Sequence, residues 1–149
     1  MKTPLCFAAC VVLFASGLPA ADPPPALTEA EFLTLLKEQV GEMPAGWGSL
    51  EALSFDPTGK KGLPGVSVAI YYSDPPTGYP QVKDDTKRLV VASHEVLKSK
   101  GIDPKEKTVF IHGRARKREK SDTGEDAVRM YGVSVYSPFS GAIEFEKNK

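Results

Sequence analysis

The segment of residues 81–100 constrains the fold of this chain most, because it has the pattern of an amphipathic helix. At about 100° per residue, one side of that helix carries a stripe of apolar and small side chains, namely Val82, Thr86, Leu89, Val90, Ser93, Val96 and Leu97. The other side is charged, apart from Val91. Gly101 and Pro104 follow where the helix should end, since glycine accepts the conformation that closes a helix and proline prevents its continuation. We therefore predict a helix that packs this stripe on a core, with Asp84 and Asp85 near its start.

A second, shorter helix is predicted to begin at Thr28. Thr28 and Glu31 have the spacing of a capping box, in which the hydroxyl caps the first turn and the glutamate reaches back. An apolar stripe follows, and Gly41 ends the segment. A helix of about three turns is too short to be stable by itself, so we expect it to pack on the rest of the domain.

Four segments alternate in the manner of β-strands, namely residues 66–72, 108–116, 128–136 and 142–146. Residues 43–62 are expected to be irregular, with a tight turn at 56–59 and with Trp47 as an apolar plug under a loop rather than a ligand platform. The order of elements predicts an α+β domain. Its core would be a single, mainly antiparallel four-stranded sheet with one strand–helix–strand crossover and the N-terminal helix packed on it.

The start of the chain has the pattern of a secretory signal, because Lys2 precedes an apolar run from Leu5 to Leu18. That run is shorter than the roughly 20 residues of a membrane-spanning helix. We divide the chain into a signal peptide (1–20), a Pro-rich linker (21–27) and one α+β domain (28–149). Cleavage fits after Gly17 or after Ala20, and an uncleaved signal anchor is the alternative. We therefore expect a secreted or periplasmic protein whose mature part has no membrane span.

Composition is consistent with one globular domain. The 149 residues are 41% hydrophobic and 26% charged, with 19 basic and 19 acidic side chains, whereas a dedicated nucleic-acid binder usually carries a strong basic excess. Both cysteines, Cys6 and Cys10, lie in the predicted signal. We expect a mature chain without disulfides, stabilised by its core alone.

The basic segment 114–120 is the sharpest chemical feature of the sequence. It is typical of a site for nucleic acid or an anionic glycan, but the acidic stretch 121–126 follows at once. If the hairpin turns at Ser121, Arg116 lies opposite Asp126 and Lys117 lies opposite Glu125. Such pairs stabilise a hairpin by about 0.2–1 kcal/mol each, so we expect the segment to neutralise itself largely.

No residue pattern identifies a catalytic, metal or cofactor site. The triplet at 122–124 has the letters of an aspartic-protease loop but lies in a charged turn, where a shared proton between carboxylates is not favoured. The two histidines, His94 and His112, are predicted on different surfaces and lack the spacing of a zinc site. We predict no metal and no cofactor.

The leading hypothesis is a non-enzymatic domain that binds a protein or small-molecule partner through the outer face of its sheet and nearby loops. The predicted contacts are Tyr79, Phe110, His112, Arg114 and Arg116. One alternative is an enzyme with a carboxylate–histidine site around His112. The other is polyanion binding by the Arg114–Lys120 segment, which strong salt dependence would reveal.

Overall fold

The computed structural model describes residues 26–148, so the predicted signal peptide, its cleavage sites and most of the linker lie outside the described residues. Two helices and five strands follow one another along the chain. They are α1 (Glu29–Val40), β1 (Trp47–Asp56), β2 (Gly65–Tyr72), α2 (Tyr79–Ser99), β3 (Phe110–Lys120), β4 (Asp126–Tyr136) and β5 (Ile143–Lys147).

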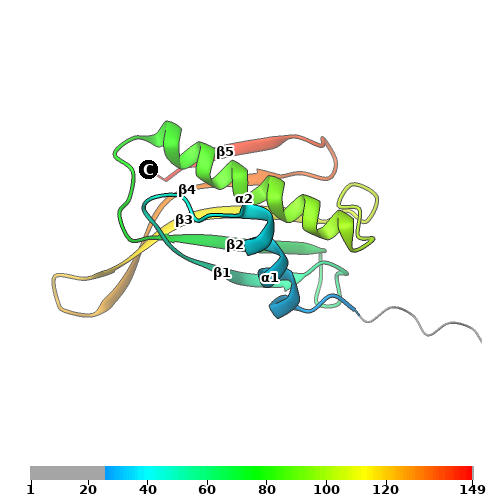
Figure 1. Cartoon of the computed structure of the whole chain (residues 1–149), viewed down its shortest axis with the longest axis horizontal. Helices are drawn as coiled ribbons and strands as arrows, with labels where there is room; N and C mark the ends of the chain where they lie inside the picture. Colours follow the sequence, from blue (N-terminus) through cyan, green and yellow to red (C-terminus); the bar gives the residue numbers. More distant parts are fainter. Residues whose placement is uncertain (1–25, 149) are drawn as a thin grey trace, which may run out of the picture.

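The strands form one sheet in the order β1-β2-β3-β4-β5 (Figure 1). β2 and β3 are parallel and are connected through α2, and the other neighbours are antiparallel. The α+β class and the strand–helix–strand crossover are confirmed. The prediction of four strands was wrong, because the segment expected to be irregular contains β1.

β1 is an edge strand whose sequence does not alternate in the manner of a β-strand. Its register against β2 shifts twice, between Trp47 and Ser49 and between Ala52 and Ser54. Each shift changes which residues face the core, so no simple alternation of apolar and polar residues remains. Trp47 is an apolar core residue, as predicted, and it is the first residue of this strand.

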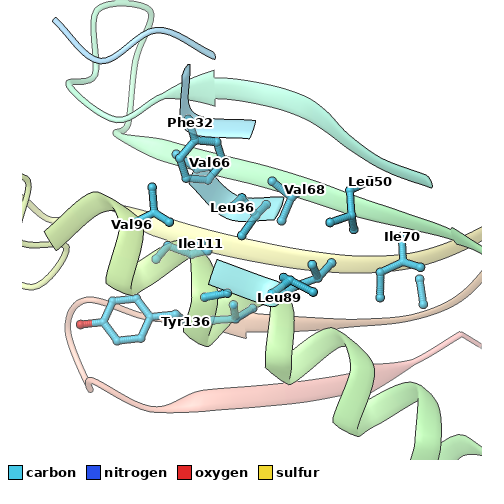
Figure 2. Close-up of a cluster of buried hydrophobic side chains, with 14 of the residues drawn as sticks. Phe32, Leu36, Leu50, Val66, Val68, Ile70, Leu89, Val96, Ile111 and Tyr136 are labelled. Atoms are coloured by element: carbon cyan, nitrogen blue, oxygen red, sulfur yellow. The ribbon is translucent and has the colours of Figure 1, made fainter. Parts of the chain in front are cut away.

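Both helices lie on the same face of the sheet (Figure 1). All seven residues of the predicted α2 stripe are buried there, and Val91 is exposed, as expected. Figure 2 shows Leu89 and Val96 of α2 with Phe32 and Leu36 of α1 and the inward side chains of the strands. The helix-lined face of the sheet is therefore the core face.

The ends of α2 follow the sequence only in part. Gly101 has a φ of 78°, and the amide of Ile102 bonds to the carbonyl of Leu97 at 3.0 Å, which closes the helix as predicted. The start was misplaced, because α2 begins at Tyr79 and its first turn holds no acidic residue. Asp85 is buried instead, where it accepts hydrogen bonds from the hydroxyl of Tyr72 at 2.6 Å and from Gln81 at 2.8 Å.

Only one of the two hydrogen bonds of the predicted capping box at α1 is present. Thr28 Oγ1 accepts from the amide of Glu31 at 3.2 Å. The carboxylate of Glu31 bonds to Lys100 Nζ at 2.7 Å, so it links the start of α1 to the end of α2. This contact helps to keep both helices on the core face.

Helix α2 touches the backbone of β3 at Gly113. A Cβ atom at this position would lie 2.4 Å from the carbonyl oxygen of Thr86, so only glycine allows the helix to lie this close. The hydroxyl of Thr86 also bonds to that of Ser134 on β4 at 2.8 Å. These contacts hold the middle of β3 and β4 in place. The candidate site lies on the opposite face of the same two strands.

The β3–β4 hairpin has a different register from the predicted one. The strand continues to Lys120, which pairs with Asp126, and Arg116 lies opposite Met130. The turn is closed by Ser121 and Glu125, with Gly124 in the left-handed region at φ 82°. The expected pairs of Arg116 with Asp126 and of Lys117 with Glu125 do not form, so the basic segment does not neutralise itself in the predicted way.

Candidate functional site

The candidate site is the face of the sheet opposite the helices, which we call the outer face. It consists of Glu51 on β1, Ser67, Ala69 and Tyr71 on β2, Phe110, His112, Arg114, Arg116 and Arg118 on β3, Val133 and Val135 on β4, and Glu144 and Glu146 on β5. The alternation predicted for β3 is confirmed, because Ile111 and Ala115 are buried on the core face. Within residues 26–148, no helix covers the outer face.

Part of the outer face is nevertheless buried. Ala69 has no exposed surface, and in the sheet register it lies between Glu51 and Arg114. Long charged side chains cover apolar surface with their methylene groups while their charged ends stay in water. Arg118 covers part of this face in another way, since its guanidinium stacks 3.7 Å from the centroid of the Tyr71 ring and bonds to both carboxylate oxygens of Glu51 at 2.7 Å.

Arg114 and Arg116 differ from Arg118 in having no carboxylate partner. Neither forms an ion pair within the described part of the chain. Arg114 Nε donates to the hydroxyl of Ser67 at 3.1 Å, and Arg116 Nε is buried without a hydrogen-bond partner. Burial, and then the charge of Arg116, lower the pKa of Arg114. Two repelling guanidinium groups thus lie side by side on this face.

His112 lies next to Arg114 along the same face and is half-buried. Burial, and then the charge of Arg114, lower its pKa below the ordinary value of 6.5, while Glu146 acts in the opposite direction. The imidazole is therefore neutral at pH 7. In that state it offers one hydrogen-bond donor and one acceptor.

A cavity of about 480 Å³ opens on the outer face across β3, β4 and β5. Its lining includes His112 and Arg114, the valines of β4, and the carboxylates of Glu144 and Glu146. A second cavity of about 710 Å³ shares Phe110 and His112 with the first and extends past Leu63, whose side chain is exposed. Both volumes fall in the range of small-molecule sites.

Four of the five predicted contacts lie on the outer face, namely Phe110, His112, Arg114 and Arg116, and the first three of these also line a cavity there. Tyr79 does not join them. It is the first residue of α2, its hydroxyl donates to the carbonyl of Asn148 at 3.2 Å, and it lines a separate cavity of about 250 Å³ with Tyr131.

Sequence reasoning did not identify the acidic residues of the site, Glu144 and Glu146. These two glutamates are not among the predicted contacts. The sequence already places Ile143 and Phe145 inward, as observed, so alternation implies outward carboxylates. What the sequence does not supply is the register of β5 against β4, which brings Glu146 opposite Val133 and so into line with Arg114.

His112 is not hydrogen-bonded in the manner of an oriented general base within the described residues. A general base needs a partner that orients it, and within residues 26–148 no hydrogen bond joins His112 to a carboxylate. The described residues also contain no group of three or more His, Cys, Asp or Glu side chains that could hold a metal ion. His94 packs against the ring of Tyr136 at 5.1 Å, on the core side of the sheet, so the two histidines do not meet.

Comparison of the chain with protein-family models, with curated proteins and with solved structures finds no match. Among the described residues, no helix is long and apolar enough to cross a membrane. The assignment of function therefore depends on the outer face itself.

Proposed function

We propose that the protein is an exported binding domain that takes an anionic group of its ligand at Arg114 and Arg116. The observation that carries this proposal is the pair of neighbouring arginines without carboxylate partners on a face that no described helix covers. Like charges held together and partly buried cost stability. An anion between them would relieve that cost through charge-assisted hydrogen bonds.

The charge of the outer face favours a compact anion over a polyanion. Its net charge is small, because it carries three arginines and three glutamates, Glu51, Glu144 and Glu146, and Arg118 is already paired with Glu51. A polyanion site gains its affinity from many unpaired cations along a surface. The Arg114–Lys120 segment offers few, since Lys120 is paired with Asp126.

A carboxylate–histidine enzyme around His112 is the second candidate. The observation in its favour is that Glu144 and Glu146 line the same cavity as His112. Hydrolysis of simple ester substrates, lost in a His112→Gln variant and retained in a His94→Gln variant, would support it over simple binding.

The binding proposal is tested by thermal unfolding in the presence of citrate or inorganic phosphate, because an anion that binds only the folded state raises Tm. The wild type should be stabilised, and the double variant Arg114→Gln/Arg116→Gln should lose most of that gain. Arg129→Gln, which removes one positive charge from a position near Tyr131, should behave as wild type. Equal stabilisation of the double variant and the wild type would contradict the proposal.

Export is a separate part of the proposal and has its own test. N-terminal sequencing of protein recovered from the periplasm or the medium should give a chain that begins at Leu18 or Ala21, after one of the two cleavage sites. Recovery of the protein from the cytoplasm with an intact N-terminus would contradict export.

A further inference from the structure

The cavity on the outer face separates opposite charges across an apolar strip. Arg114 on β3 lies in register with Val133 on β4, and Val133 lies in register with Glu146 on β5. The adjacent row runs from His112 through Val135 to Glu144 in the same order. All six residues line the one cavity of about 480 Å³.

This pattern is not that of a site for an anion alone. A purely anionic ligand could bind at the arginines, but it would leave the two carboxylates in the same cavity unused. They do not neutralise the arginines either, since within residues 26–148 no ion pair joins Glu144 or Glu146 to a basic side chain. The basic side of the cavity on β3 and the acidic side on β5 therefore remain separate, and each can bind a group of the opposite charge.

We propose that the cavity binds a dipolar ligand, a short peptide with free ends. Its carboxylate lies at Arg114, with Arg116 next to it on the same face but outside the cavity lining, and its ammonium group lies at Glu144 and Glu146. The inference rests on the proposed function, to which it adds a positively charged group of the ligand that binds at the two glutamates.

The dimensions agree with such a peptide. From β3 to β5 there are two interstrand spacings, or about 9–10 Å, and three extended residues span about 10 Å. The apolar side chains of the peptide would lie on Val133 and Val135, towards Phe110 and Phe139, whose rings contact each other with centroids 5.7 Å apart. Phe139 does not line the cavity itself, but it is 76% exposed, so uncovered apolar surface adjoins the cavity at Phe110.

The test uses three probes that differ only at their ends: free trileucine, N-acetyl-trileucine and trileucine amide, titrated calorimetrically into the full mature chain. Free trileucine should bind at least tenfold more tightly than either capped form, because each cap removes one of the two charges. A capped peptide that binds as tightly as the free one would overturn the inference.

The variants separate the two ends. Glu144→Gln/Glu146→Gln should abolish the difference between the free and acetylated peptides, and the single substitutions should each reduce it. Arg114→Gln/Arg116→Gln should abolish the difference between the free and amidated peptides. Arg129→Gln should preserve both, and circular dichroism should confirm that every variant is folded.

The outcomes also distinguish the inference from the proposed function. If the glutamate variants change nothing while the arginine variants weaken binding, the ligand is a simple anion and only the inference fails. If the arginine variants leave the preference for the free carboxylate intact, the proposed function fails. If free trileucine does not bind at all, the inference is overturned, and the citrate and phosphate measurement decides the proposed function separately.

Discussion

Arg114 and Arg116 project from the same side of β3, two residues apart, and neither forms an ion pair within residues 26–148. This pairing costs stability, because neighbouring cations repel and Arg116 Nε is buried without a partner. Sites where a sequence departs from the most stable solution are often sites of function. This relationship is the physical basis of the binding proposal.

Replacing Arg116 by methionine should stabilise the protein and weaken anion binding at once. The substitution keeps most of the apolar stem and removes the unsatisfied donor, so we expect the free energy of unfolding to rise by about 1 kcal/mol. Urea unfolding measures this change, and the Tm gain with citrate should shrink in parallel. Arg129→Met, at an exposed position, should stay within about 0.5 kcal/mol of wild type. A destabilised Arg116→Met variant would show that the arginine is structural.

The titration of His112 should report on Arg114. Removing the cation in Arg114→Gln removes one of the two causes that lower the pKa of His112, the larger being burial. The pKa should therefore rise towards 6.5, as followed by NMR of the imidazole protons, with His94→Gln used for assignment. Arg129→Gln should leave it unchanged. No response to the loss of Arg114 would mean that the two side chains do not share one face.

The lowered pKa of His112 also fixes the sign of a stability effect. The folded protein takes up this proton at lower pH than the unfolded chain does. The contribution to stability is therefore complete above pH 6.5 and is lost as the pH falls through the folded-state pKa. His112→Gln should remove this part of the pH dependence.

Gly113→Ala should destabilise the protein, because its Cβ would meet the carbonyl oxygen of Thr86 at 2.4 Å and the side chain of Val90 at 3.0 Å. Overpacking of this kind costs about 1–3 kcal/mol, measurable by urea unfolding. Gly65→Ala, also in a strand, meets nothing closer than 3.6 Å and provides the matched control. Equal stability of the two variants would show that α2 does not lie against β3 at this point.

Tyr72→Phe should cost about 1.5–3 kcal/mol at neutral pH, since the hydroxyl bonds to the buried carboxylate of Asp85. Burial, and then Asp85, raise the pKa of Tyr72 in the folded state above its ordinary value of 10.0. The unfolded chain thus loses this proton first, so the associated stability is present below pH 10 and is lost as the pH rises further.

Unfolding curves measured on both sides of pH 10 check this sign. The stability difference between wild type and Tyr72→Phe should decrease above pH 10, whereas Tyr79→Phe, an exposed tyrosine, should show no such change. A difference that grows with pH would contradict the assignment of Asp85 as the partner.

What the sequence predicted correctly is local. The stripe of α2 and its closure at Gly101 follow from neighbouring residues within one helix, and the faces of β3 follow from simple alternation. β1 escaped prediction because two register shifts interrupt its alternation. The hairpin register was wrong because the turn residues around Gly124, not the charges that flank them, decide which residues pair.

Only the part of the candidate site that lies on β3 could be predicted, because the rest depends on contacts between strands. Phe110, His112, Arg114 and Arg116 share one strand, so alternation alone brings them together. Glu144 and Glu146 reach the site through the pairing of β4 with β5, and Ser67 reaches it through the parallel pairing of β2 with β3. Such pairings join residues distant in sequence and are not encoded by any local pattern.

The most direct test of the central claim is a backbone-amide NMR titration of the isotope-labelled protein with citrate. If the arginine pair is the anion site, the largest shifts should fall on residues 112–116 of β3 and on 133–135 of β4, and the Arg114→Gln/Arg116→Gln variant should lose them. Shifts confined to the hairpin tip at 117–126, or to the surroundings of Tyr79, would contradict it.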